Sequence, residues 1–312
     1  MATEIRAFEE SMLAAYADVW NRSRREVPLH VPETAETMRV LLVKDPDFDP
    51  RGTFVAFDGG EAVGIGEAYT QKTRLAAGKS QGFITVEVVP ERRGQGIEHE
   101  LAGRTMGYLK SRGIREAILW ETLSIEWRAR LAADCGLERF RTYYEMRADL
   151  TRPIPDAPFQ PGTTLEYRGF TDASREFVRE WAGTKDAAFV DHFNSVPSDP
   201  ETFYIYRELK GTIGRYALAR DPAGRPTGVS LSEVIRAEGE TRAWVMVLGT
   251  IPEARRKGLG RALLADALKW ARSERETEAF LGMDAQNEKA LGLYRSVGFE
   301  VFVENATYHK FL

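Results

Sequence analysis

A glycine-rich, basic segment is the part of the chain whose residue types could most readily do chemistry: Pro252-Glu-Ala-Arg-Arg-Lys-Gly-Leu-Gly-Arg261. A turn of this kind that enters a helix leaves several backbone N–H groups unpaired, and the helix dipole adds partial positive charge there. Such a helix start binds phosphate. Four cations surround the turn, at Arg255, Arg256, Lys257 and Arg261, which suits a pyrophosphate. A basic helix start with solvated side chains is the alternative that these residues leave open.

Elements with different periodicities are predicted on either side of this turn. The run 243–251 is almost wholly apolar, which is typical of a strand covered on both faces. Residues 258–271 place Leu264, Leu268 and Ala271 on one face of a helix. The other elements predicted in the second half are strands at 214–220, 227–236 and 279–283, a helix from Asn287 to Gly298, and a closing pair of strands at 299–303 and 307–312. Mixed strands and helices predict an α/β or α+β fold with helices on both faces of a sheet.

The two halves of the chain are related by one constant offset, since 252 − 90 = 162. Positions that match at this offset include Pro90, Arg93 and Gly96, which correspond to Pro252, Arg255 and Gly258. Between the halves, residues 151–163 carry four prolines, which favour an extended connector. We therefore predict one domain at 1–150, a linker at 151–163 and a second domain at 164–312.

Composition excludes several classes of protein. The 43 Lys and Arg residues against 47 Asp and Glu give a net charge of −4, which argues against binding nucleic acid by broad phosphate neutralisation. Cys135 is the single cysteine, so neither an intramolecular disulfide nor a cysteine-based metal site is expected. The chain has no run of about 18 apolar residues and no signal-peptide pattern. We expect a cytoplasmic protein without a membrane or metal partner, either a monomer or a homodimer.

The basic turn resembles the acyl-CoA signature of the GNAT superfamily of N-acetyltransferases, Arg/Gln-x-x-Gly-x-Gly/Ala after a central strand. Arg255, Gly258 and Gly260 match its three specified positions, and Asn287 and Tyr294 match the asparagine and tyrosine of the next helix. Gly298-Phe299 matches the ending of that helix. Partial matches to the same signature extend over residues 1–150. The whole chain is therefore similar to tandem GNAT proteins, an arrangement shared with mycothiol synthase. The resemblance implies two tandem GNAT folds, each with a mixed, mostly antiparallel sheet and helices on both faces.

The resemblance also implies acetyl-CoA as the acyl donor. Amides of the turn would hold the pyrophosphate, the central strand would pair with the pantetheine arm, Asn287 would bond the arm, and Tyr294 would lie near the thioester sulfur. The implied cofactor-binding residues are Leu248, Gly249, Thr250, Arg255, Arg256, Lys257, Gly258, Leu259, Gly260, Arg261, Asn287 and Tyr294.

Acetyl transfer to an amine needs a base, an oxyanion donor and an acid. An alkyl ammonium has a pKa near 10.4, so only about one molecule in a few thousand is neutral at pH 7. The candidates for the base are Glu233 and Asp284, each of which could equally be a solvated charge at a strand edge; Glu238, Glu240 and His309 are weaker candidates. The N–H of Leu248 is the candidate oxyanion donor, and Tyr294, whose alternative is core packing, is the candidate acid.

The first half departs from the signature at three positions. Glu98 replaces the second glycine, Ile125 replaces the asparagine and Ala132 replaces the tyrosine. A carboxylate at Glu98 would compete for the N–H groups of the turn and repel a pyrophosphate. We therefore expect a degenerate first domain that serves packing, the acceptor pocket or sensing, with a weak CoA site left open. In mycothiol synthase, as the family pattern goes, a glutamate at the start of the central strand serves as the catalytic base. Trp244 stands at that position here, which argues against that activity.

The predicted function is acetyl-CoA-dependent N-acetylation of a primary amine on a small molecule, catalysed by the second domain. The alternative is a non-catalytic acyl-CoA-binding or sensing protein. Acceptor pockets in the family come from the first helices, here 172–212. Their possible lining residues, which could equally be core aromatics, are Trp181, His192, Phe193 and Tyr204.

Overall fold

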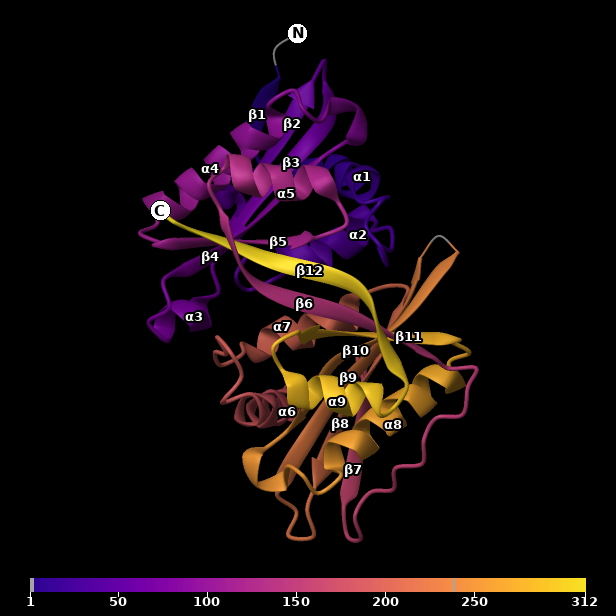
Figure 1. Cartoon of the computed structure of the whole chain (residues 1–312). Helices are drawn as coiled ribbons and strands as arrows, with labels where there is room; N and C mark the ends of the chain where they lie inside the picture. Colours follow the sequence, from indigo (N-terminus) through magenta and orange to yellow (C-terminus); the bar gives the residue numbers. More distant parts are fainter. Residues whose placement is uncertain (1–2, 238) are drawn as a thin grey trace. The chain divides into compact units, whose positions relative to one another are not determined.

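The computed structural model describes residues 3–237 and 239–312, and the chain forms two compact units (Figure 1). Unit 1 contains the chain up to Tyr143 together with Val303–Leu312, and unit 2 contains Tyr144–Phe302. The candidate base Glu238 lies outside the described residues. Within the two described stretches, no helix combines the length and the apolar character needed to cross a membrane.

Unit 1 is a mixed sheet in the order β1-β2-β3-β4-β5-β12, where β12 is Phe299–Phe311. Strands β1 to β4 pair antiparallel, β4 and β5 pair parallel, and β5 and β12 pair antiparallel. Leu101 of α4 lies against Gly64 on β3, and the hydroxyl of Tyr16 on α1 donates to Glu67 on the same strand. Gly64 and Glu67 are three residues apart, and side chains alternate between the faces of a sheet, so α4 and α1 cover opposite faces. The elements are β1 (Glu4–Ala7), α1 (Leu13–Ser23), α2 (Ala35–Met38), β2 (Thr53–Asp58), β3 (Glu61–Tyr69), α3 (Lys72–Ala76), β4 (Gln81–Val88), α4 (Ile97–Ser111), β5 (Glu116–Thr122) and α5 (Glu126–Asp134).

Unit 2 repeats this plan in the order β6-β11-β10-β9-β8-β7. Strands β7 to β10 pair antiparallel, and β10 and β11 pair parallel. The elements are β6 (Glu138–Asp149), which begins in unit 1, β7 (Thr164–Gly169), α6 (Arg175–Ala188), α7 (Pro200–Tyr204), β8 (Thr212–Arg220), β9 (Pro226–Ala237), β10 (Glu240–Thr250), α8 (Leu259–Ser273), β11 (Glu278–Asp284), α9 (Glu288–Arg295) and β12 (Phe299–Phe311). The predicted mixed, mostly antiparallel α/β fold is therefore confirmed.

Two glycines set how closely the helices approach the sheet of unit 2. A Cβ at Gly249 on β10 would lie 2.9 Å from the Cβ of Ala188 at the end of α6. A Cβ at Gly228 on β9 would lie 3.0 Å from Leu263 of α8. The predicted apolar face of α8 is confirmed, because Leu264, Leu268 and Ala271 are buried in the core between this helix and the sheet.

The predicted pair of closing strands at 299–303 and 307–312 is wrong. The chain runs as one strand, β12, through the polar residues Glu304 and Asn305 between the two predicted strands. Asn305 is only 1% exposed, and β12 pairs with β5 from Asn305 opposite Thr122 to Phe311 opposite Glu116. Pairing with β5 places the last ten residues in unit 1, whereas the predicted second domain extended to residue 312.

Candidate active site

The turn between β10 and α8 has the geometry of an anion site. Arg256 and Gly258 adopt left-handed φ angles of 60° and 85°, and Gly258 caps the helix. The first helical bond runs from the N–H of Ala262 to the carbonyl of Gly258 at 3.0 Å, so the N–H groups between them have no acceptor inside the helix. A Cβ at Gly258 would meet nothing within 4 Å, which leaves the space over the turn open.

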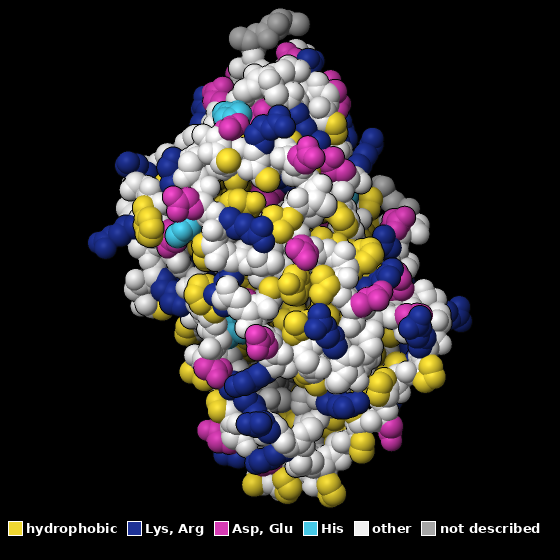
Figure 2. Space-filling view, in the orientation of Figure 1, with side chains coloured by type: hydrophobic (Ala, Val, Ile, Leu, Met, Phe, Trp, Pro, Cys, Tyr) yellow, Lys and Arg dark blue, Asp and Glu magenta, His cyan; other side chains and the backbone are white. Residues whose placement is uncertain are grey.

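Basic side chains surround this opening. Arg256, Lys257 and Arg261 are exposed, and Figure 2 shows Lys and Arg side chains grouped in the region where β10 leads into α8. One nitrogen of Arg261 donates to the carbonyl of Ser296 at 3.3 Å, which directs that side chain along the start of the helix. The turn can therefore offer both N–H groups and cations to a phosphate.

Arg255, which was predicted to add a fourth cation, turns its guanidinium into the protein instead. Its Nε donates to the carbonyl of Thr250 at 3.2 Å, and one Nη donates to the carbonyl of Ala188 at 2.9 Å. Both Nη atoms also bond the carboxylate of Asp191, at 2.6 and 2.8 Å. The side chain of Arg255 therefore fastens the end of α6 to the end of β10 and positions the turn.

A gap opens between β10 and β11 beside this turn. The two strands are in register at Trp244 and Phe280, while β10 stays paired with β9 as far as Thr250. The N–H of Ile251 donates to the carbonyl of Thr227 on β9, at 3.0 Å. Because backbone groups alternate in direction along a strand, the N–H of Leu248 points away from β9 and into the gap. An extended pantetheine arm could pair with β10 there.

Helix α9 carries the two other predicted cofactor contacts. The Oδ1 of Asn287 accepts the N–H of Ala290 at 3.1 Å and caps the helix, so its carbonyl oxygen has a structural task. Tyr294 is partly buried, with its ring centroid 6.1 Å from that of Phe299. Burial raises the pKa of Tyr294 to about 12, so the phenol keeps its proton throughout the neutral range.

The two candidate bases lie in different surroundings. Glu233 is 7% exposed on β9, directly opposite Trp244 in the register of β9 and β10. Asp284 is 4% exposed at the end of β11, and its Oδ1 accepts the N–H of Gln286 at 3.0 Å. The carboxylate of Asp284 therefore shapes the turn into α9.

The aromatic residues proposed for the acceptor pocket are not equivalent. Trp181 is a core residue with no exposed area, and its Nε1 donates to the carbonyls of Ala217 and Ser230 at 3.2 and 3.3 Å. Lining by Trp181 is therefore excluded, and its alternative as a core aromatic is confirmed. Phe193 is 45% exposed, and Tyr204 packs partly buried against the core beneath α6.

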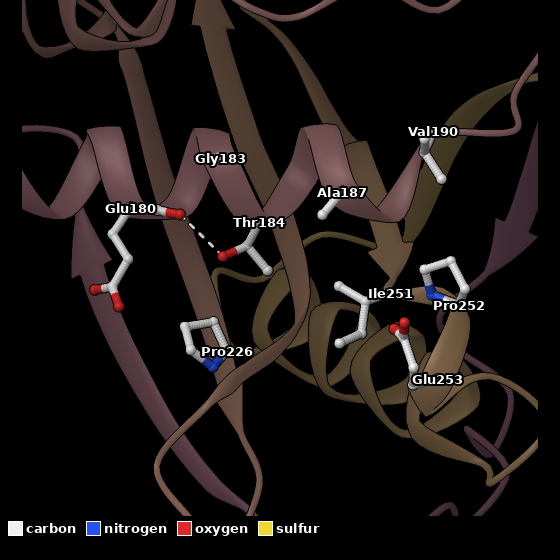
Figure 3. Close-up of a pocket in the computed structure, with 9 residues that line it drawn as sticks. All are labelled: Glu180, Gly183, Thr184, Ala187, Val190, Pro226, Ile251, Pro252 and Glu253. Carbon is white, nitrogen blue, oxygen red and sulfur yellow. Dashed lines mark hydrogen bonds between the residues drawn. The ribbon is translucent and has the colours of Figure 1, made fainter.

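A hollow of about 460 Å³ lies between α6 and the start of the turn that joins β10 to α8 (Figure 3). Ala187, Val190 and Ile251 give it an apolar lining, and the Oγ of Thr184 donates to the carbonyl of Glu180 rather than into the hollow. The complete lining is Glu180, Gly183, Thr184, Ala187, Val190, Pro226, Ile251, Pro252 and Glu253. None of the candidate catalytic residues is in this lining.

The corresponding turn of unit 1 also has two residues with left-handed φ angles, but a side chain of the protein binds one of its N–H groups. Gly94 and Gly96 have φ angles of 73° and 89°, and Arg93 donates to the carbonyls of Val88 and Ser23 as Arg255 does to its counterparts. The carboxylate of Glu98, 6% exposed, accepts the N–H of Gly94 at 2.8 Å. A residue of the chain itself thus occupies the position where an anion would bind.

The gap between β4 and β5 of unit 1 is filled by buried charges. The two Nη atoms of Arg128 on α5 bond Glu87 on β4 and Glu121 on β5, at 2.5 and 2.8 Å. The three side chains are at most 4% exposed, and Arg24 adds a second contact to Glu87 at 2.8 Å. Burial raises the pKa of Glu121 to about 7, whereas Arg128 and Arg24 hold the pKa of Glu87 below its ordinary value despite its burial.

Sequence reasoning missed this buried cluster. At the offset of 162, Glu87, Glu121 and Arg128 correspond to Gly249, Met283 and Ala290, none of which is charged. The signal that could have revealed the cluster is the alignment of charged residues in the first half with uncharged residues in the second half. The equivalent gap of unit 2 therefore contains no such ion cluster.

Comparisons with known proteins agree with this geometry. The model of the acetyltransferase (GNAT) family matches residues 169–299, and that of an acetyltransferase (GNAT) domain matches residues 4–124. A mycothiol acetyltransferase of Salinispora arenicola is 30% identical over 304 residues, covering 94% of this chain and 92% of that protein. The chain belongs to the GNAT acetyltransferase family. It is an acyltransferase, as predicted, and it transfers an acetyl group to an amine.

Solved structures of this family share the fold of the whole chain. A tandem GNAT protein from the clavulanic acid biosynthesis pathway has a TM-score of 0.74 at 18% identity, covering 99% of this chain and 98% of that one. A GCN5-related N-acetyltransferase from Sphaerobacter thermophilus has a TM-score of 0.71 at 19% identity, covering 99% and 95%. The predicted tandem arrangement of two GNAT folds is confirmed.

Proposed function

We propose that unit 2 transfers the acetyl group of acetyl-CoA to a primary amine of a small molecule. The observation that carries this proposal is the contrast between the two turns. The N–H groups between Gly258 and Ala262 have no acceptor inside the helix, and a Cβ at Gly258 would meet nothing within 4 Å, whereas in unit 1 the carboxylate of Glu98 already accepts the N–H of Gly94. GNAT acetyltransferases use acetyl-CoA as the donor, and an open turn in unit 2 is what its pyrophosphate needs.

The donor would be held by groups that the geometry leaves available. The N–H groups from Gly258 to Arg261 would bind the pyrophosphate together with Arg256 and Lys257. The main chain from Leu248 to Thr250 would bind the pantetheine arm, with the Nδ2 of Asn287 as a further donor. Acetyl-CoA supplies an activated thioester, and the N–H of Leu248 points into the gap where the carbonyl oxygen would develop negative charge.

Glu233 is the base that we propose. The glutamate expected at the start of the central strand is replaced by Trp244, and the carboxylate of Glu233 lies directly opposite this tryptophan on the adjacent strand. Ser230, the partner of Leu248 in the same register, is three residues from Glu233, which is about 10 Å along a strand. Glu233 therefore removes the ammonium proton through water rather than directly.

Tyr294 would act on the leaving sulfur. A phenol with a pKa of about 12 stays protonated at neutral pH, so it is always available as a donor. A thiol titrates near 8.5, so complete proton transfer from this phenol to the thiolate is uphill. The contribution of Tyr294 is therefore a hydrogen bond that stabilises the thiolate as it forms.

Relatives named mycothiol acetyltransferase match most of this chain, but Trp244 stands where the glutamate that serves as base is expected for that activity. We therefore propose a different small amine as the acceptor. The test is release of free thiol from acetyl-CoA across a panel of amines, with the products identified by mass. Amine-dependent release supports the proposal, whereas CoA binding without a product for any amine favours a binding or sensing protein.

A further inference from the structure

A strained residue lies in the turn that would bind the pyrophosphate. Arg256 has a left-handed φ of 60°, a conformation that a side chain makes unfavourable. Its counterpart in unit 1 is Gly94, whose φ of 73° carries no such cost because glycine has no Cβ. A strained backbone persists only where the surrounding structure fixes it. Unit 2 must therefore contain contacts that hold Arg256 in this conformation.

Contacts on both sides of Arg256 fix the turn. After it, the Nε2 of Gln160 donates to the carbonyl of Lys257 at 2.7 Å. Before it, both Nη atoms of Arg255 bond the carboxylate of Asp191, at 2.6 and 2.8 Å. The backbone of Arg256 is therefore held between two neighbours that are themselves fastened to other parts of the unit.

The ion pair with Asp191 is the contact that links the turn to the segment after α6. Asp191 follows Val190, which lies across from Pro252 at the start of the turn (Figure 3). The bond to Arg255 lowers the pKa of Asp191, so the pair stays charged throughout the neutral range. Two parallel bonds between a guanidinium and a carboxylate also fix the orientation of both groups. The side chain of Arg255 thus cannot swing with the turn.

Unit 1 contains the same contact beside a turn without strain. Arg93 donates to the carbonyl of Ser23 and bonds the carboxylate of Glu26, three residues further along. The matching residues in unit 2 are Ala188 and Asp191, since 188 − 23 = 165 and 191 − 26 = 165. The repeat therefore supplies an internal comparison, with one kind of ion pair beside a strained arginine in unit 2 and beside a glycine in unit 1.

We propose that Asp191 is a positioning residue for the acyl donor: through Arg255 it holds Arg256 in the left-handed conformation that brings its N–H together with those at the start of α8. This inference rests on the proposed function. In unit 1 the carboxylate of Glu98, at the start of α4, accepts the N–H of Gly94 at 2.8 Å, so these groups do converge on one anion there. Without the ion pair Arg256 would relax toward a right-handed φ, and the N–H groups would no longer converge.

The charge of Asp191 gives the proposal a distinctive sign. A carboxylate close to a phosphate site repels the ligand, so removal of a residue that acted only through its charge would strengthen CoA binding. The same removal would free Arg255 as an additional cation for the pyrophosphate, which acts in the same direction. A positioning role for Asp191 predicts weaker binding instead.

Titration calorimetry with CoA on the whole chain tests this role. Asp191→Ala should weaken CoA binding about fivefold, the upper value for a pair whose carboxylate side chain is 65% exposed. Asp191→Glu should bind CoA within about twofold of the wild-type affinity, since Glu26 makes this contact in unit 1. Glu26→Ala is the matched control, which removes the same ion pair from unit 1 and should leave the affinity unchanged.

Two variants of Arg256 separate backbone strain from charge. In an Arg256→Ala protein, which lacks the cation but keeps a side chain, Asp191→Ala should again weaken CoA binding about fivefold. In an Arg256→Gly protein the same change should weaken it less than about twofold, because glycine adopts the left-handed φ freely. Thermal unfolding of each variant checks that unit 2 is folded.

The outcomes distinguish this role from the proposed function. Unchanged or tighter CoA binding by Asp191→Ala overturns the role of Asp191 and leaves the proposed function standing. An equal loss in the Arg256→Gly and Arg256→Ala backgrounds does the same, because the effect then does not pass through the backbone of Arg256. A wild-type chain that does not bind CoA overturns the proposed function, and the role of Asp191 with it.

Discussion

Gly260→Glu should reproduce in unit 2 the occupied turn of unit 1. Gly260 corresponds to Glu98, and the N–H that would meet the new carboxylate belongs to Arg256, the counterpart of Gly94. A Cβ at Gly260 would lie 3.7 Å from Leu293 and 3.8 Å from Thr250, so a side chain fits there without displacing a neighbour. A carboxylate in the first turn of a helix is also compatible with the dipole, so α8 should remain folded.

The expected loss of CoA affinity follows from the bond that the ligand must break. A hydrogen bond to a charged group is worth about 1.5–3 kcal/mol, and each 1.4 kcal/mol is a tenfold change in affinity. Displacing the carboxylate from the N–H of Arg256 should therefore weaken CoA binding roughly 10- to 150-fold. Repulsion between the carboxylate and the pyrophosphate adds to this loss.

Titration calorimetry with CoA measures this change. Gly260→Gln is the matched control, because it has nearly the same size without the charge and should weaken binding less than the glutamate does. Thermal unfolding checks that α8 and the rest of unit 2 stay intact. A Gly260→Glu protein that binds CoA within about threefold of the wild-type affinity would refute the assignment of the pyrophosphate to this turn.

Four further outcomes are expected. Tyr294→Phe should lower kcat roughly 10- to 150-fold with little change in the dissociation constant of CoA, because it removes one hydrogen bond to a charged sulfur; unchanged kcat across the pH range would exclude the role. Glu98→Gly should leave one CoA bound per chain by calorimetry, because the ion cluster of Arg128 still fills the gap of unit 1, and a second bound CoA would contradict that reasoning. Arg128→Ala should lower the free energy of unfolding by about 3–5 kcal/mol in urea titrations, since the buried carboxylate of Glu121 loses its ion-pair partner and that of Glu87 keeps only Arg24, and a loss below about 1 kcal/mol would count against the cluster. Burial raises the pKa of Glu67 from 4.5 to about 7, so the folded state binds this proton more tightly and stability falls as the pH rises from about 4.5 to 7, by up to about 3 kcal/mol; Glu67→Gln should flatten that slope, and an unchanged slope would disprove the assignment.

The parts of the site that were predictable are local in the sequence. The run of β10, the turn with Gly258 and the periodic face of α8 are adjacent in the chain, so composition and spacing specify them together. The internal repeat predicted a second copy of these elements in the first half, and it identified Glu98 as the residue that replaces the second glycine of the turn. In the structure the carboxylate of Glu98 accepts a hydrogen bond from the N–H of Gly94.

Contacts across strands could not be predicted in this way. Glu233 lies opposite Trp244 only because of the register of the β9–β10 hairpin, and a shift of one residue would move either side chain to the other face. Arg128 meets Glu87 across 41 residues, a pairing that no local pattern encodes. The guanidinium of Arg255 was similarly predicted as a phosphate ligand, since the sequence does not reveal Asp191 and Ala188 as nearby acceptors.

The last ten residues of the chain have a consequence for its synthesis. Val303–Leu312 belong to unit 1, where their strand lies beside β5, although every other residue of that unit is translated before Tyr144. While the ribosome makes the second half, β5 therefore waits with an unpaired edge, which is a template for association with other chains. A premature stop near the end of the message would consequently damage the part of the protein that was made first.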